Sequence, residues 1–93
     1  MERVSRDELR EGVAAGGVLL DLRPLPQPVF GLLPTSLSLD AVGRGELPDL
    51  APDTPLYLVC ERGQVSELAG LYLEAAGFKN VCHLAGGTRA WPN

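Results

Sequence analysis

Aromatic residues, cysteines and long hydrophobic runs are all scarce in this chain of 93 residues. Phe, Trp and Tyr together make up 5% of it, so a hydrophobic core must be built mainly from Leu, Val and Ala. No apolar run approaches the ~20 residues that a membrane-spanning helix needs, and the mixed-charge N-terminus lacks the apolar centre of a secretory signal. No charge block or polar tract indicates disorder. These absences predict a single cytoplasmic domain over residues 1–93, with no membrane partner.

Positive charge is scarce too, because 12 acidic residues face seven arginines and one lysine, for a net charge of -4. A nucleic-acid-binding protein needs a basic face to neutralise phosphates, so no nucleic acid partner is expected. Any small anionic substrate must instead be held by a local positive field. The two cysteines make a poor disulfide framework, and a reducing compartment would keep them as thiols.

Helical and extended patterns alternate along the chain. Ser5 and Glu8 have the spacing of a capping box, which predicts a short amphipathic helix over residues 6–15. The apolar face of this helix would carry Leu9 and Val13. Apolar or alternating runs predict four strands, over residues 18–22, 36–39, 56–60 and 81–84.

The segments between these strands differ in character. Residues 23–34 contain four prolines, which exclude a helix or a central strand and predict a long loop. Residues 40–55 leave room for one irregular helical turn. From about Ser66 to a stop at Gly77, apolar residues recur at helical spacing, namely Leu68, Leu71, Tyr72 and Ala75 or Ala76. Strands separated by helices favour a parallel α/β sheet, in which sites form beyond the C-terminal ends of the strands.

Cys60 stands at such an end, between a predicted strand and a predicted helix. The first-turn N–H groups of that helix and its dipole point at the loop, and Arg62 adds a full positive charge. Gly63 lets consecutive N–H groups converge into an anion-binding nest. These effects favour the thiolate form of Cys60, which is the nucleophilic form. Glu61 opposes them if it points inward, so we expect it to face solvent or to pair with Arg62 or a substrate cation.

The chain contains VLLDLR at residues 18–23, CERGQVS at residues 60–66, GFKNV at residues 77–81 and LAGGTRAW at residues 84–91. Together these segments resemble the rhodanese-like sulfurtransferase family. The active-site segment of that family is similar to CERGQVS at residues 60–66, which opens a helix that ends in GFKNV at residues 77–81. Its closing Gly-Gly…Trp motif resembles LAGGTRAW at residues 84–91, and its apolar-Asp-x-Arg strand resembles VLLDLR at residues 18–23. The resemblance covers nearly the whole chain in the family's order and spacing.

The resemblance implies a fold, a reaction and a set of site residues. The fold is α/β, a rhodanese-like three-layer fold with a central mostly parallel sheet of about five short strands flanked by helices. In the reaction, Cys60 takes a sulfane sulfur from thiosulfate or a persulfide donor and passes it to cyanide or to a thiol acceptor, either a small molecule or a protein. Loop N–H groups hold the persulfide, and no cofactor is expected. The residues of the anion-binding loop are Glu61, Arg62, Gly63, Gln64, Val65 and Ser66, and the supporting residues are Asp21, Arg23, Gly86 and Gly87.

The chain departs from the family at some positions. Residues 31–36 match the family's Gly-His-Ile-Pro-Gly-Ala segment only at Gly31 and Pro34, with Leu32 in place of the His. Val65 stands where single-domain members often have Arg. These departures predict poor turnover of thiosulfate and a protein or low-molecular-weight persulfide as the true donor. They also keep open the alternative of a non-catalytic or regulatory rhodanese-like module that binds sulfur or a partner.

Structural roles compete with chemical ones at several of these positions. Asp21 is more simply an acceptor of backbone N–H bonds near a strand end. Gly86 and Gly87 serve a tight turn that borders the pocket. Trp91 is expected to plug the core and close the domain.

Other chemistry is less well supported by the pattern. Cys82 and His83 are neighbours in a predicted strand and therefore point to opposite faces, which argues against a shared metal ion, so no metal is expected and His83 is predicted to be half-exposed. A phosphatase of the related Cys-loop type would need Arg at the sixth position after Cys60, where Ser66 stands. A thiol-disulfide oxidoreductase would need a Cys-x-x-Cys pair, which is missing.

Overall fold

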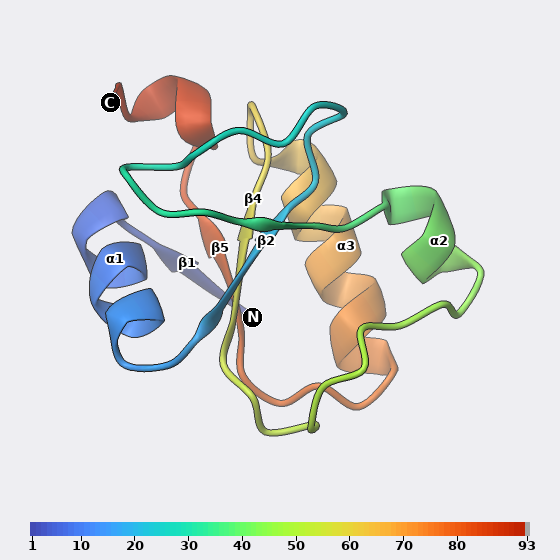
Figure 1. The fold of residues 1–93 in the computed structure, drawn as a ribbon. Coiled ribbons are helices and arrows are strands. Elements are labelled where there is room, and N and C mark those ends of the chain that lie inside the picture. Colours follow the sequence, from blue (N-terminus) through green and yellow to red (C-terminus); the bar gives the residue numbers. More distant parts are fainter. Residues whose placement is uncertain (93) are drawn as a thin grey trace.

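Five parallel strands form one sheet with helices against both faces in the computed structural model, which describes residues 1–92 (Figure 1). The strands are β1 (Glu2–Val4), β2 (Val18–Asp21), β3 (Thr35–Ser36), β4 (Leu56–Val59) and β5 (Val81–Leu84). The helices are α1 (Arg6–Ala14), α2 (Leu39–Gly43) and α3 (Gln64–Ala75), followed by the 3₁₀ turn η1 (Thr88–Ala90). The strand order is β1-β5-β4-β2-β3.

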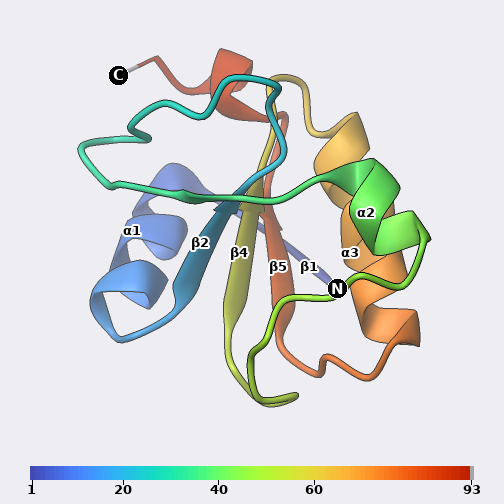
Figure 2. The same cartoon turned by 45° about the vertical axis from the view of Figure 1, so that its right-hand side comes forward.

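The elements form three layers. Figures 1 and 2 show α1 on one face of the sheet and both α2 and α3 on the other. Parallel neighbours need crossover connections. Helix α2 lies in the connection from β3 to β4 and α3 in that from β4 to β5, whereas residues 22–34 connect β2 to β3 without a helix. The predicted α/β fold, with its five-stranded parallel sheet between helices, is confirmed. No helix within residues 1–92 has the length and apolar character needed to cross a bilayer.

The hydrophobic core is divided by the sheet into two clusters. Leu56 and Leu58 of β4 belong to the cluster under α2 and α3, whereas Val59 belongs to the cluster under α1. This alternation explains why β4 has a continuous apolar sequence, because both of its faces are buried. Trp91 does not plug the core as predicted: it is only half-buried and packs against the margin of the α1 cluster.

The capping box predicted for the first helix is present at the start of α1. The Ser5 hydroxyl accepts a hydrogen bond from the Glu8 N–H (3.2 Å), and the Glu8 carboxylate accepts one from the Ser5 N–H (3.0 Å). Leu9 is completely buried and Val13 packs beside it. Local sequence and tertiary packing therefore agree in this helix.

Strand β1 is not predicted by any pattern in the sequence, and two boundaries differ from the prediction by more than one residue. The strand expected over residues 36–39 is only Thr35–Ser36, and α2 begins at Leu39 because the Ser38 hydroxyl accepts the Ala41 N–H (3.2 Å) as an N-cap. Helix α3 begins at Gln64 rather than near Ser66, and Gly63 occupies its N-cap position. The helix N-terminus is therefore closer to Cys60 than the sequence predicts.

The face of α3 that packs against the sheet is also not the one that the apolar pattern suggests. The buried residues of α3 are Ser66, Ala69, Gly70 and Leu73, three of which have small side chains. Small residues let the helix lie close to the sheet; a Cβ on Gly70 would overlap the sulfur of Met1. The large apolar residues Leu68, Leu71 and Tyr72 are exposed instead.

Candidate active site

Three segments that are far apart in the sequence meet at the C-terminal edge of the sheet. Strand β4 lies between β2 and β5, so the residues that follow these three strands lie side by side. After β2, the Leu22 N–H donates to the carbonyl of Val59 (2.8 Å), and after β5 the Thr88 N–H donates to the carbonyl of Cys60 (2.9 Å). The topology thus brings the Cys60 loop together with the supporting residues predicted after β2 and β5.

The sulfur of Cys60 takes the place of an N-cap side chain at the start of α3. The Gly63 N–H donates to Sγ at 3.0 Å, and the Ser66 N–H does so at 3.3 Å. The N-cap residue Gly63 has no side chain that could accept a hydrogen bond. The sulfur therefore accepts the hydrogen bond from the Ser66 N–H that the side-chain oxygen of an N-cap residue accepts in other helices. Both N–H groups and the helix dipole stabilise negative charge on this sulfur. The predicted arrangement of strand, cysteine and helix is confirmed.

The hydroxyl of Ser66 completes the surroundings of the sulfur. Cys60 Sγ and Ser66 Oγ are 3.4 Å apart, and the hydroxyl donates to the Gly63 carbonyl at 3.2 Å. In this arrangement a thiol donates its hydrogen to Oγ. When the sulfur is a thiolate, the hydroxyl can turn its hydrogen toward Sγ, because a hydroxyl is both donor and acceptor. Ser66 is fully buried, so this adjustment occurs out of contact with water.

Two glycines let the Cys60 loop and the turn after β5 approach each other closely. Gly63 has a φ of +89°, in the left-handed region that favours glycine. A Cβ on Gly87 would overlap the carbonyl oxygen of Glu61 and the amide nitrogen of Arg62. The Arg89 N–H also donates to the Glu61 carbonyl (2.9 Å). The loop carbonyls are thus held by the residues after β5, which leaves loop amides directed toward Cys60.

A cavity of about 210 Å³ opens beside Cys60. It is lined by Leu22, Arg23, Pro24, Cys60, Glu61, Arg62, Gln64 and Val65. Cys60 itself is only 4% exposed, so the cavity is the route by which a small reagent reaches its sulfur. Within residues 1–92 the first-turn amides of Gln64 and Val65 have no hydrogen-bond acceptor. The site therefore offers unused N–H donors beside the sulfur.

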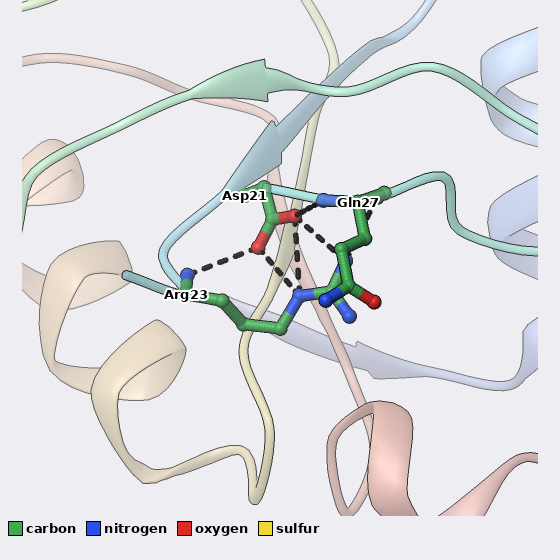
Figure 3. A network of polar contacts seen from close by, with 3 residues as sticks. All are labelled: Asp21, Arg23 and Gln27. Atoms are coloured by element: carbon green, nitrogen blue, oxygen red, sulfur yellow. Dashed lines mark hydrogen bonds and ion pairs between the residues drawn. The ribbon is translucent and has the colours of Figure 1, made fainter. Parts of the chain in front are cut away.

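Asp21 holds Arg23 in place at the edge of this cavity (Figure 3). The Asp21 carboxylate accepts from Nε (2.9 and 3.1 Å) and Nη2 (2.7 Å) of Arg23, and also from the backbone N–H groups of Arg23 (3.0 Å) and Gln27 (3.4 Å). The prediction that Asp21 accepts backbone N–H bonds is confirmed. The side-chain hydrogen bond to Asp21 raises the pKa of Arg23, while partial burial opposes this rise. Arg23 lines the same cavity as Cys60.

The two charged residues of the loop itself have different partners. Glu61 faces solvent, as expected, but its carboxylate lies 3.8 Å from the guanidinium of Arg89 rather than pairing with Arg62. Both groups are exposed, so this ion pair is weak. Arg62 is exposed and forms no ion pair with any residue in the described part of the chain. Its guanidinium is available to an anion that enters the cavity.

The neighbouring strand β5 contains the other two residues considered for chemistry. His83 is 3% exposed, which corrects the prediction of a half-exposed side chain; the small residues of α3 bring that helix close over β5. Burial lowers the pKa of His83, whereas burial raises the pKa of Cys82 on the opposite face of the strand. Among residues 1–92, no three His, Cys, Asp or Glu side chains are grouped so that they could hold a metal ion.

Three contributors to the site are not identified by the sequence. The amides of Thr88 and Arg89 anchor the loop carbonyls, and the carbonyl of Gln27 accepts from Arg23 Nη2 (2.8 Å). Every one of these contacts uses a backbone group, which any residue type can supply. The glycine pair at residues 86–87, which indicates a close approach of backbone segments, is a signal for the Thr88 and Arg89 amides but not for the Gln27 carbonyl.

Comparison with known sequences identifies relatives of this chain. A sequence model described as "Rhodanese-like domain" matches residues 5–93. The chain is 31% identical over 91 residues to the thiosulfate sulfurtransferase GlpE of Ectopseudomonas mendocina, which covers 97% of this chain and 84% of that protein. It is 32% identical over 92 residues to the adenylyltransferase and sulfurtransferase Uba4 of Ogataea parapolymorpha, which covers 97% of this chain. The chain spans only 23% of the length of that Uba4.

Comparison with solved structures gives a similar result. The rhodanese homologue from the extremely thermophilic bacterium Thermus thermophilus has a TM-score of 0.78 and 35% sequence identity. The match covers 96% of this chain and 99% of that one. The two folds therefore correspond over almost their full lengths.

Proposed function

Since the chain belongs to the rhodanese-like domain family, which includes relatives named as sulfurtransferases, we propose that Cys60 carries a sulfane sulfur as a persulfide between a donor and a thiol or cyanide acceptor. The observation that carries this proposal is the position of Sγ at the N-terminus of α3, where it accepts the Gly63 and Ser66 amides. This environment stabilises the anion that both half-reactions require. The chemistry needs a free thiol, which a reducing compartment such as the cytoplasm maintains.

In the first half-reaction the Cys60 thiolate attacks the sulfane sulfur of the donor. A bond forms between Sγ and that sulfur, and the donor's own S–S bond breaks. With thiosulfate as donor, the bonding pair leaves with sulfite; with an organic persulfide, it leaves with the thiolate. The product is the Cys60 persulfide anion, and no oxidant or proton is consumed.

In the second half-reaction an acceptor thiolate or cyanide attacks the outer sulfur of the persulfide. The Sγ–S bond breaks, and its electron pair returns to Cys60 as a thiolate. Between the two steps the outer sulfur occupies the cavity, where the unused Gln64 and Val65 amides and the Arg62 guanidinium can bind it. Two successive displacements on one residue give ping-pong kinetics.

The lining of the cavity favours an organic persulfide over thiosulfate as the donor. Leu22, Pro24 and Val65 provide apolar contacts, while one of the two nearby guanidiniums, that of Arg23, is already paired with Asp21. A dianion such as thiosulfate gains little from an apolar wall. A persulfide that carries an organic group buries that group against the wall and keeps its anionic sulfur near Arg62.

Mass spectrometry of the whole protein tests this proposal. Incubation with a set of donors, thiosulfate and organic persulfides among them, should add about 32 Da to Cys60, the mass of one sulfur. Cyanide should remove the adduct as thiocyanate. The Cys60→Ser protein should acquire no adduct, and the Cys82→Ser protein should behave like the unaltered chain. An adduct on Cys82, or none with any donor, would contradict the proposal.

The low exposure of Cys60 favours one second candidate, a non-catalytic or regulatory module that binds sulfur without passing it on. The same experiment separates the two functions. A module of that kind forms the adduct but releases it neither to cyanide nor to thiols. Multiple turnovers of thiocyanate formation per protein molecule would exclude it.

A further inference from the structure

Helix α3, which provides the amides around the sulfur, also has an apolar surface that the rest of residues 1–92 leaves partly exposed. Val65, Leu68, Leu71 and Tyr72 are 39%, 42%, 52% and 43% exposed, and we refer to these four residues as the α3 ridge. With 3.6 residues per turn they lie in one arc of the helix, opposite its buried face. Ala75 and Ala76 extend the same arc and are exposed as well.

The charged residues of α3 all lie on another flank of the helix. The Glu74 carboxylate pairs with the N-terminal amine of Met1 (2.6 Å), just before β1. Glu67 stands seven residues earlier in α3, about two turns, and so lies on the same flank. The α3 ridge extends toward α2, where Tyr72 lies beside Gly43. A helix that stays in water normally carries charge on its outer arc, whereas a contiguous uncharged apolar surface is typical of an interface.

The α3 ridge is continuous with the cavity beside Cys60. Val65 is both the first residue of the ridge and part of the cavity lining, and Arg62 lies at the same end without an ion-pair partner in the described residues. Sulfur transfer requires that the acceptor sulfur touch the persulfide directly. A cavity of about 210 Å³ admits a cysteine side chain but not a folded protein, so the body of a protein acceptor must rest on the surface around it.

We propose that the α3 ridge is the docking surface for a sulfur-acceptor protein that presents a cysteine thiol beside an apolar segment and an acidic group. The acidic group meets Arg62, and the apolar segment covers the ridge. From Val65 to Tyr72 the ridge is about 10 Å long, a distance that three to four residues of extended chain span, at roughly 3.3 Å each. The inference rests on the proposed function of Cys60, because it identifies the partner of that same site.

Two synthetic peptides provide the acceptors for a test. Both contain one cysteine and one aspartate, and they differ only three to five positions from the cysteine, where one has leucines and the other serines. The protein is loaded with sulfur, mixed with each peptide and quenched over time, and the peptide persulfide is measured by mass spectrometry. We expect the leucine peptide to accept sulfur about tenfold faster, as partial burial of two leucines provides.

Matched variants locate the origin of this preference. The double variant Leu68→Ser/Leu71→Ser should lose it, while transfer to cyanide stays unchanged because neither residue lines the cavity. Leu33→Ser removes a side chain that is 85% exposed elsewhere and should keep the preference. A single variant, Leu71→Gln, provides a milder change if the double variant folds poorly, and thermal melting of each variant checks folding.

The outcomes separate this inference from the proposed function. Equal rates for the two peptides, or a preference that survives in the double variant, would overturn the docking surface while leaving sulfur transfer to cyanide intact. A dimer in solution that the double variant converts to monomer would assign the α3 ridge to a second copy of this chain, and would also overturn the proposal. Failure of every donor to load Cys60 would overturn both the function and the surface.

Discussion

The two cysteines of this protein are on adjacent strands and yet have opposite surroundings. Cys60 follows β4, is almost completely buried, and accepts hydrogen bonds from two amides at the N-terminus of α3. Cys82 lies within β5 and is more exposed, but burial, followed by the nearby Glu2 carboxylate, raises its pKa. If solvent exposure alone determined reactivity, Cys82 would be the more reactive thiol. The position of its sulfur at a helix N-terminus indicates instead that Cys60 is the reactive thiol.

Replacing each cysteine in turn is the strongest test of this contrast. We expect Cys60→Ser to abolish sulfur transfer, because within residues 1–92 no N–H group donates a hydrogen bond to the other thiol, that of Cys82. We expect Cys82→Ser to retain nearly full turnover. Thiocyanate formation under saturating donor measures both. Comparable losses in the two variants would show that the distinction between the two sites is wrong.

The next prediction concerns the close contact between Gly87 and the backbone of the Cys60 loop. Gly87→Ala places a Cβ against the backbone of Glu61 and Arg62, at a residue whose φ is +73°. The loop must shift, and we expect a loss of at least about 2 kcal/mol in the free energy of unfolding and a roughly hundredfold lower transfer rate. Chemical denaturation and steady-state kinetics measure the two effects.

Gly16→Ala is the matched control for that substitution. Gly16 has a φ of +108° but no heavy atom within 4 Å of its added Cβ, so it carries the conformational cost without the overlap. It should lose stability and keep its transfer rate. If Gly87→Ala and Gly16→Ala proved equivalent in kinetics, the loop geometry would not depend on the turn after β5.

The Ser66 hydroxyl offers a smaller perturbation of the same site. Ser66→Ala keeps the amide that donates to Cys60 and removes only the hydroxyl, so we expect about a tenfold lower transfer rate. Ser38→Ala is a suitable control because that hydroxyl caps α2 by accepting a hydrogen bond from the Ala41 N–H, and Ser38 is not among the residues that line the Cys60 cavity. The control should cost similar stability but leave the rate unchanged. A rate equal to that of the unaltered protein in Ser66→Ala would remove the hydroxyl from the mechanism.

The order of most strands and helices along the chain, and the position of Cys60 between a strand and a helix, could be predicted from the sequence because both depend on local patterns. Apolar runs mark β2, β4 and β5, and the capping box at Ser5 marks α1. Gly63 signals the positive φ that the loop needs. These signals lie within a few residues of the features that they predict, so no knowledge of distant contacts is required.

Other features depend on contacts that a single sequence does not encode in an obvious way. The buried face of α3 is set by how closely the helix must approach the sheet, and the small residues Ser66, Ala69 and Gly70 outweigh the larger ones in that position. His83 is buried for the same reason, since it lies on the strand that this helix covers. The anchors of the Cys60 loop use backbone amides, which have no residue signature.

The smallest effect is expected at His83, on the strand that carries Cys82. Burial lowers the pKa of His83 below its usual value of 6.5, with Arg3 and the N-terminal amine lowering it further and Glu67 opposing them. As the pH falls below 6.5 the unfolded chain therefore takes up a proton before the folded one, and the folded state loses stability. The variant His83→Leu should lose less stability than the unaltered protein between pH 7 and pH 5, as thermal melting measures. Since His83 does not line the cavity, the transfer rate at pH 7 should be the same in both proteins. Equal losses of stability in the two proteins between pH 7 and pH 5 would show that the acid sensitivity comes from other residues.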